Sequence, residues 1–249
     1  MLSSVGWAAL GVGFIFLMTS LGAASVLFCR EDTLPKSQTG MMGFAGGVMT
    51  AASVWSMLLP AIEQTRAEGT LPCWLPAAAG TAAGAAFLCA LDALILRLRR
   101  GGSAEKSSML MTAITLHNIP EGMAVGLAFA LSGGADGLTA AAALALGIGV
   151  QNIPEGAAVS LPLRRLGMSR GRAFSMGVLS GAVEPLFGML AVIAVSGISR
   201  IMPWLLGFSA GAMLYVVVCE LIPAAGDRRG LFWYVAGFLL MMILDVALG

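Results

Sequence analysis

The sequence predicts an all-α integral membrane protein with eight transmembrane helices, inverted repeats and both termini outside. Hydrophobic residues make up 58% of the 249 positions, charged residues make up 11%, and the mean hydropathy is +0.90. A soluble chain of this length needs far more charged surface, so the protein is expected to lie in a membrane. A helical span takes about 20 apolar residues, which gives the chain room for roughly eight spans with short connections.

Eight apolar segments follow one another along the chain, and most charged residues lie between them. We expect the transmembrane helices at approximately 5–28, 40–62, 72–96, 108–131, 138–161, 173–197, 202–224 and 230–248. Because the connections are short, residues 1–249 are expected to form a single transmembrane domain. The four cysteines form no close pair and no basic stripe is present, so neither a disulfide framework, a cysteine zinc site nor a nucleic-acid partner is expected.

The basic residues predict how the chain is oriented. The first, third, fifth and seventh connections hold 2, 4, 4 and 2 Lys and Arg residues, and only Arg66 and Arg200 lie in the others. Basic connections stay in the cytoplasm, so both termini are predicted to face the extracytoplasmic side of the cell (inner) membrane. No Lys or Arg precedes the first apolar segment, so no cleavable signal peptide is expected.

The second and seventh segments resemble each other. G-F-A-G-G-V-M at 43–49 is similar to G-F-S-A-G-A-M at 207–213, and each is followed by a Pro-Ala pair. These segments run in opposite directions, which is typical of inverted-repeat transporters. Segments one to three and six to eight then form the repeats that flank segments four and five. The alternative is that Gly, Ala and Met recur by chance in apolar helices.

The fourth and fifth segments each contain a polar hexapeptide, H-N-I-P-E-G at 117–122 and Q-N-I-P-E-G at 151–156. His117 and Glu121, like Gln151 and Glu155, are four residues apart and share one helix face. The proline of each hexapeptide has no amide proton and takes a hydrogen bond out of the helix. Such residues are costly inside a bilayer, so they indicate a site for a cation.

Acids without basic partners support this interpretation. Six carboxylates fall within the apolar segments, namely Asp92, Glu121, Glu155, Glu184, Glu220 and Asp245. No Lys or Arg lies deep in any segment. The three near mid-span, Glu121, Glu155 and Glu184, would cost on the order of 8–10 kcal/mol if ionised and unpaired. They must therefore be protonated, hydrated or bound to cations, whereas Asp92 and Asp245 near helix ends are assigned structural roles.

The side chains in these segments favour a first-row divalent metal. They offer the imidazole of His117, the only histidine, with amides, carboxylates and the soft sulfur of Met49. This combination suits Zn²⁺, Fe²⁺ or Mn²⁺ better than an all-oxygen Ca²⁺ or Mg²⁺ cage. The alternative for His117 is a buried polar residue that is satisfied by hydrogen bonds.

These motifs resemble the ZIP (Zrt/Irt-like) family of metal-ion transporters, particularly its bacterial GufA-type branch. The S-G-x-x-E element from Ser180 to Glu184 and the G-F-x-x-G-x-M starts of segments two and seven extend the resemblance over the whole chain. The resemblance implies a homodimer that moves metal into the cytoplasm, with zinc as the commonest substrate and Cd²⁺, Fe²⁺ or Mn²⁺ as others. It implies no separate cofactor. It also implies a binuclear site whose first metal position is formed by Met49, His117, Glu121, Gln151 and Glu155. The second position is formed by Asn118, Asn152 and Glu184, with Glu121 and Glu155 as bridges.

The sequence departs from the family pattern in two places, and its topology predicts a transport path. Gln151 stands where many members have histidine, which should weaken or broaden the metal preference. The third connection lacks a histidine-rich stretch, so metal sensing by that loop is not expected. Segment two runs outward and segment seven runs inward, so Ser56 and Glu63 are predicted at the outer entrance and Glu220 at the cytoplasmic exit. The alternative for Glu63 is an ordinary solvated acid of a loop.

We expect alternating access around a fixed midplane site, and two rival functions remain open. A proton-coupled carrier of organic solutes would explain the carboxylates as proton relays. An intramembrane serine protease could use Ser209, because G-F-S-A-G matches the nucleophile-elbow pattern. An intramembrane metalloprotease needs H-E-x-x-H, which a single histidine excludes.

Overall fold

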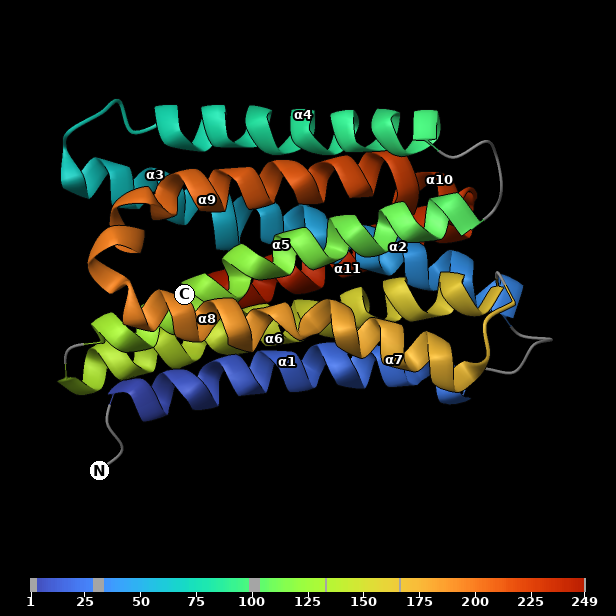
Figure 1. The fold of residues 1–249 in the computed structure, drawn as a ribbon, viewed down its shortest axis with the longest axis horizontal. Helices are drawn as coiled ribbons and strands as arrows, with labels where there is room; N and C mark the ends of the chain where they lie inside the picture. The colour runs from blue at the N-terminus through green and yellow to red at the C-terminus, as the bar shows by residue number, and fades with distance from the viewer. Residues whose placement is uncertain (1–3, 29–33, 99–103, 133, 166, 249) are drawn as a thin grey trace.

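The computed structural model describes residues 4–28, 34–98, 104–132, 134–165 and 167–248. The side chains of some helical residues, His117 among them, lie outside this description. Within the described ranges the protein is all-helical (Figure 1). The elements are α1 Ser4–Phe28, α2 Leu34–Ala52, η1 Ser53–Leu58, α3 Leu59–Glu68, α4 Leu75–Leu98, α5 Ala104–Leu131, α6 Gly134–Arg165, α7 Arg170–Gly181, α8 Val183–Ile193, α9 Val195–Val216, η2 Val217–Leu221, α10 Ile222–Ala225 and α11 Arg228–Leu248.

These elements form eight helical segments, because α2, η1 and α3 are continuous, α7 leads into α8, and η2 joins α9 to α10. Among the described residues, seven segments are long and apolar enough to cross a membrane. The remaining one is α5, whose apolar described part is Asn118–Leu131. The protein is therefore a multi-pass membrane protein. The predicted eight segments are all present as helices, and seven of them meet the length and hydropathy of a span.

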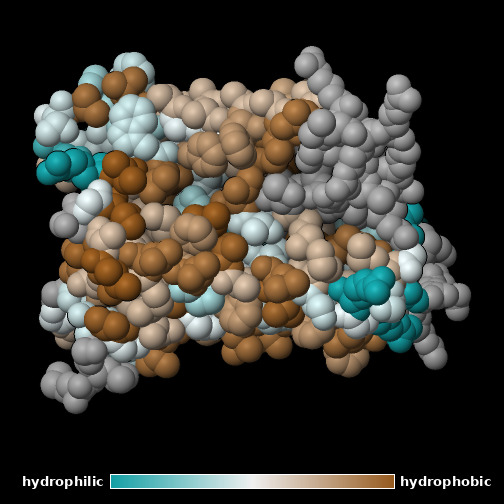
Figure 2. All heavy atoms as spheres, in the orientation of Figure 1, coloured by the Kyte–Doolittle hydropathy of each residue, from teal (hydrophilic) through white to brown (hydrophobic). Residues whose placement is uncertain are grey.

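The surface matches this assignment. Figure 2 shows apolar residues over the middle of one face and hydrophilic residues gathered toward its two ends. Large apolar side chains are exposed along the helices, such as Leu10 (56%), Leu186 (58%) and Ile243 (58%). The start of α1, the α3–α4 connection and the end of α11 lie at the same end of the bundle (Figure 1). The arginines of the α6–α7 and α10–α11 connections lie at the opposite end.

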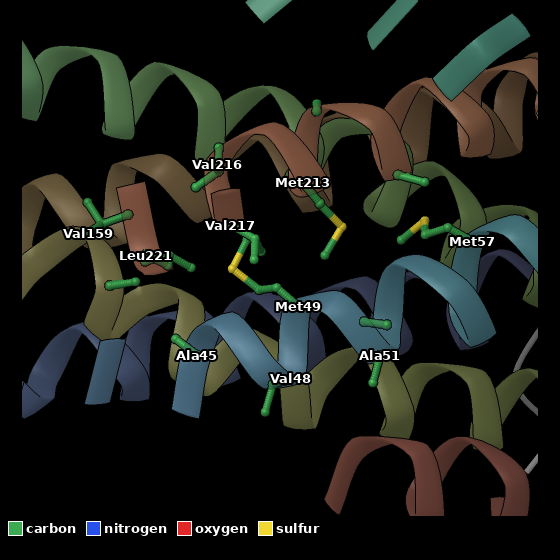
Figure 3. Packing of buried hydrophobic residues seen from close by; sticks show 14 of the residues in the cluster. Ala45, Val48, Met49, Ala51, Met57, Val159, Met213, Val216, Val217 and Leu221 are labelled. Atoms are coloured by element: carbon green, nitrogen blue, oxygen red, sulfur yellow. The ribbon is translucent and has the colours of Figure 1, made fainter. Parts of the chain in front are cut away.

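The helices pack as two groups. α1, α5, α6, α7 and α8 contact mainly one another, and α2, α3, α4, α9, α10 and α11 form the second group. The groups meet chiefly where α5 contacts α9 and where α2 contacts α6. In the apolar interior, Met49 of α2 and Met213 of α9 lie close to Val217 of η2 (Figure 3). The two hexapeptides therefore belong to the first group, and Met49 belongs to the second.

Prolines act differently in different helices. α5 runs through Pro120 and α6 through Pro154 without interruption, although each proline leaves one carbonyl without its helical donor. In contrast, α7 ends at Gly181 and α8 begins at Val183, so Pro185 falls in the first turn of a new helix. A proline is tolerated in a first turn because its amide would have no helical partner there. Of these three prolines, only Pro185 therefore lies at a break between two helices.

The two segments that resemble each other in sequence share a structural irregularity. η1 ends just before Pro60 and η2 ends just before Pro223, and both are π-helical. The amide of Leu59 donates to the carbonyl of Val54, five residues back, and the amide of Ile222 donates in the same way to Val217. A proline removes the next i−4 donor, which favours this wider turn at both places.

Glycines let the helices that carry the hexapeptides approach their neighbours. A Cβ at Gly122 of α5 would lie 2.3 Å from the carbonyl oxygen of Glu184 in α8. A Cβ at Gly156 of α6 would lie 2.0 Å from the carbonyl oxygen of Thr19 in α1. Only a residue without a side chain permits such contacts. The glycine that ends each hexapeptide thus fixes one helix contact of the first group.

Candidate metal centre

Six of the sequence-predicted site residues come from three helices and are completely buried. Each has an exposed fraction of 0%: Asn118 and Glu121 of α5, Gln151, Asn152 and Glu155 of α6, and Glu184 of α8. The i, i+3 and i+4 spacing within each hexapeptide places its members on one helix face. Glu184 lies in the first turn of α8, where the positive end of the helix dipole favours a carboxylate.

Hydrogen bonds tie these side chains together across the helices. The Nε2 of Gln151 donates to Oε1 of Glu121, which joins the two hexapeptides. The Nδ2 of Asn118 donates to the carbonyl of Ser180 in α7 at 3.2 Å. Asn152 is hydrogen-bonded to Glu184, and its Nδ2 lies 3.5 Å from the carbonyl oxygen of Ile15. These bonds link α5 to α6, α5 to α7, and α6 to α1 and α8, and we call the buried side chains that make them the polar network.

The orientation of the amides decides what the network can bind. All three donate through nitrogen to a protein acceptor. Their oxygens, Oδ1 of Asn118, Oε1 of Gln151 and Oδ1 of Asn152, are buried and have no hydrogen-bond partner among the described residues. The same holds for Oε2 of Glu184. Buried oxygens without donors cost roughly 1–3 kcal/mol each, and a bound cation would remove that cost.

Two predicted ligands are not placed with this network. The side chain of His117 lies outside the described part, although its backbone is in α5 on the turn that carries Glu121. Met49 of α2 is buried in an apolar cluster to which both helix groups contribute (Figure 3). Within the described residues, no three His, Cys, Asp or Glu side chains are close enough to hold a metal by themselves. A metal here therefore needs amide oxygens, His117 or water in addition to carboxylates.

A residue that the sequence analysis missed completes the network. Thr19 of α1 is buried, and its Oγ1 donates to Oε1 of Glu184 at 2.6 Å. A threonine in an apolar helix carries no signal of its own, because its hydroxyl usually bonds within the helix. Only the packing of α1 against α6 and α8 shows that this one reaches a carboxylate.

The predicted entrance residues line one cavity of about 350 Å³, between η1, α3, α6 and α11. Ser56 of η1 and Glu63 of α3 line it together with Asp245 of α11. The hydroxyl of Ser56 donates to Oδ1 of Asp245 at 2.9 Å, and Oδ2 of Asp245 has no hydrogen-bond partner among the described residues. Asp245, expected to have a structural role, thus accepts a hydrogen bond from Ser56 and also lines the cavity. Glu220 lies in η2, toward the other end of the bundle.

The chain is similar to known proteins over most of its length. Residues 96–245 match the model of the family described as ZIP Zinc transporter. The chain is 35% identical to "Zinc transporter ZIP11" of Homo sapiens, and the alignment covers 99% of this chain and 98% of that protein. It is 39% identical to "Zinc transporter GufA" of Myxococcus xanthus (93% and 94% covered) and 37% identical to "Zinc transporter ZIPB" of Bordetella bronchiseptica (98% and 82% covered).

This result excludes the serine protease, one of the two rival functions that the sequence left open. The family comprises transporters and not enzymes, so the protease interpretation of Ser209 is wrong. Ser209 is instead a fully buried residue of α9, in the part of that helix that resembles α2. The family match over residues 96–245, together with relatives aligned over almost the entire chain, shows that this protein belongs to the ZIP zinc transporter family.

Proposed function

We propose that the protein transports Zn²⁺ into the cytoplasm through a site formed by the two hexapeptides and Glu184. The observation that carries the proposal is the set of four buried oxygens, on Asn118, Gln151, Asn152 and Glu184, that lack hydrogen-bond donors among the described residues. The two relatives of highest identity among those compared above carry the name zinc transporter, which supports zinc as the substrate.

The residues fit a site with two metal positions. His117, Glu121, Gln151 and Glu155, with Met49 as a soft addition, are the proposed ligands of the first. Asn118, Asn152 and Glu184 are the proposed ligands of the second, and Glu121 and Glu155 bridge the two. Gln151 already bonds to Glu121, so one movement of the amide can bring its oxygen to a cation and keep that carboxylate oriented.

The two helix groups supply the element that alternating access requires. We propose that Zn²⁺ enters through the cavity lined by Ser56, Glu63 and Asp245, loses water at the buried site and leaves past Glu220. Carboxylates at the entrance exchange for water ligands, and the amide and carboxylate oxygens of the site then replace the remaining hydration shell. The group that holds α5, α6 and α8 would move as a unit against the group that holds α2 and α9.

The test is zinc uptake by proteoliposomes that contain purified protein. His117→Ala, Glu155→Ala and Glu184→Gln should each abolish or strongly reduce uptake, because each removes a proposed ligand. Asp136→Asn is the matched control, since Asp136 is an exposed carboxylate near the start of α6. Uptake at the control level in all three site variants would contradict the proposal.

A second measurement separates zinc transport from the remaining rival, a proton-coupled carrier of organic solutes. Zn²⁺ or Cd²⁺ should raise the unfolding temperature of the protein in detergent, because an ion that binds only the folded state stabilises it. The site variants should lose this stabilisation and the Asp136 variant should keep it. A carrier of organic solutes would show no metal-dependent shift in any of them.

A further inference from the structure

Thr19 differs from the other threonines for which the structure gives a hydroxyl hydrogen bond, because its hydroxyl donates to a side chain of another helix. The hydroxyl of Thr139 donates within its own helix at 3.0 Å. The hydroxyls of Thr50, Thr65, Thr81 and Thr115 each donate to the carbonyl four residues back in their own helix at 2.7 Å. The corresponding distance for Thr19, from Oγ1 to the carbonyl oxygen of Ile15, is 3.2 Å. Its Oγ1 lies 2.6 Å from Oε1 of Glu184. A hydroxyl has one proton to donate, and here it is directed to the carboxylate.

The length of this bond indicates its character. Hydroxyl donors to a carboxylate lie at about 2.5–2.7 Å, and they are roughly twice as strong as neutral hydrogen bonds. Oε1 of Glu184 is thus satisfied within the protein, while Oε2 has no donor among the described residues. The two oxygens of this carboxylate consequently have different tasks, one being held by α1 and the other remaining for a cation.

The surroundings hold Thr19 in this position. The backbone of Gly156 packs against its carbonyl oxygen, where a Cβ would lie at 2.0 Å. A Cβ at Gly181 would lie 2.8 Å from Cγ2 of Thr19 and 3.2 Å from Oε1 of Glu184. Two glycines therefore make room for the pair, one in the second hexapeptide and one at the end of α7.

We propose that Thr19 is a positioning residue of the metal site, which fixes Glu184 as a ligand through a single oxygen. The inference rests on the proposed function, because it requires Glu184 to bind the transported metal. It also assigns α1 a part in substrate binding, although the family match begins at residue 96 and does not include this helix.

The experiment measures the dissociation constant for Zn²⁺ of the purified protein in detergent and the KM of zinc uptake in proteoliposomes. Thr19→Val keeps the shape and the Cγ2 contact but removes the donor, and should raise both constants roughly tenfold. Thr19→Ser keeps the donor and should leave both within about twofold of the native protein. Thr81→Val is the matched control, because that hydroxyl bonds only to its own helix in the structure.

A double variant shows whether Thr19 acts through Glu184. If it does, Thr19→Val should change zinc affinity no further once Glu184→Gln is present. An equal loss of affinity from Thr19→Ser and Thr19→Val would assign Thr19 to packing and overturn the inference. A further tenfold loss of zinc affinity in the double variant would also overturn the inference. Native zinc affinity in Thr19→Val would do the same.

These results separate the two proposals. Native uptake and native zinc affinity in Glu184→Gln would contradict the proposed site itself. Loss of zinc affinity in Glu184→Gln together with native affinity in Thr19→Val would contradict only the role of Thr19. The unfolding temperature without metal, measured for every variant, identifies any that fail to fold, and Thr19→Ser then carries the test.

Discussion

The resemblance to the family leads to an expectation of histidine at position 151, and this protein has Gln151 there instead. In the structure its Nε2 donates to Glu121, and its Oε1 is buried with no hydrogen-bond partner among the described residues. An imidazole can do both tasks at once, since one ring nitrogen donates to the carboxylate and the other binds the metal. The amide offers an oxygen in place of a nitrogen, which is a weaker ligand for Zn²⁺ and Fe²⁺ and a comparatively better one for Mn²⁺.

Gln151→His should therefore increase affinity for Zn²⁺ and sharpen discrimination against Mn²⁺. We expect the KM for zinc to fall by roughly an order of magnitude, in the range typical of changes around metal ligands. The measurement is zinc uptake in proteoliposomes with Mn²⁺ and Cd²⁺ as competitors. Gln151→Ala is the comparison, because it removes both the ligand and the donor to Glu121. An unchanged competition profile in Gln151→His would place residue 151 outside the metal's ligands.

Protons should compete with the metal at this site. Metal ligands must be deprotonated, so neutral imidazole and ionised carboxylates bind Zn²⁺ and their protonated forms do not. Zinc affinity should therefore fall as the pH is lowered from about 7.5 to 5.5, because histidine takes up a proton in this range. His117→Gln should flatten this dependence, because only the carboxylates would remain to titrate. A zinc affinity independent of pH in the native protein would contradict imidazole ligation.

Glycines at the helix contacts bring the site residues together. Gly122 and Gly126 of α5 pack against Glu184 and Gly188 of α8, where an added Cβ would lie 2.3 Å from each carbonyl oxygen. Such close packing of small residues four apart is how membrane helices associate without a hydrophobic driving force. Gly122 and Gly126 are not proposed ligands themselves, yet their contacts decide how near α8 and Glu184 come to the first hexapeptide.

Gly156→Ala should destabilise the protein and weaken zinc binding together. The added Cβ would meet the carbonyl oxygen of Thr19 at 2.0 Å, so α1 and α6 must separate. Overpacking of this kind costs typically about 1–3 kcal/mol. Gly13→Ala on α1 is the control, since nothing lies within 4 Å of its added Cβ. Unfolding temperature in detergent and zinc affinity are the readouts, and native values for both in Gly156→Ala would show that the contact is not needed.

The π-helical segments η1 and η2 support the proposed inverted repeat. They occupy corresponding places before Pro60 and Pro223, in segments that resemble each other and run in opposite directions. Ser56 lies in η1 and Glu220 in η2, so the proposed entrance and exit both fall on these wider turns. π-Helical turns inside α-helices are frequent at functional sites, which agrees with that placement.

The whole molecule has one strongly basic end among its described residues. The α6–α7 and α10–α11 connections carry six arginines, whereas Arg66 and Arg200 lie toward the other end. We propose that the basic end faces the cytoplasm and that the start of α1 and the end of α11 face outward. The predicted homodimer stays a prediction, because it concerns a second copy of the chain.

Cys73 provides a test of this orientation. It is a free, partly exposed cysteine in the α3–α4 connection, at the end proposed to face outward. In a variant without the other three cysteines, a membrane-impermeant maleimide added to intact spheroplasts should modify Cys73. A single cysteine introduced at Gly167, at the opposite end, should react only after the membrane is permeabilised. The reverse pattern would invert the proposed topology and the direction of uptake.

Much of this protein follows from the sequence by itself. Length and hydropathy determine a multi-pass helical protein, because a bilayer accepts few structures other than apolar helices of about 20 residues. The hexapeptides also indicate their chemistry without a structure, since the spacing of a helix places residues three and four apart on one face. Buried acids without basic partners must then be protonated, hydrated or bound to a cation, whatever the packing.

Only the tertiary structure decided which helices meet and which atoms remain for a ligand. Thr19 could not be found from sequence, because helical periodicity relates residues within one segment and says nothing of contacts between segments 165 positions apart. Likewise, the sequence does not show whether the nitrogen or the oxygen of the Asn118, Gln151 and Asn152 amides bonds to the protein, because each amide can both donate and accept. Their neighbours in space accept hydrogen bonds from the nitrogens and leave the oxygens without donors among the described residues, and those oxygens form the proposed cation site.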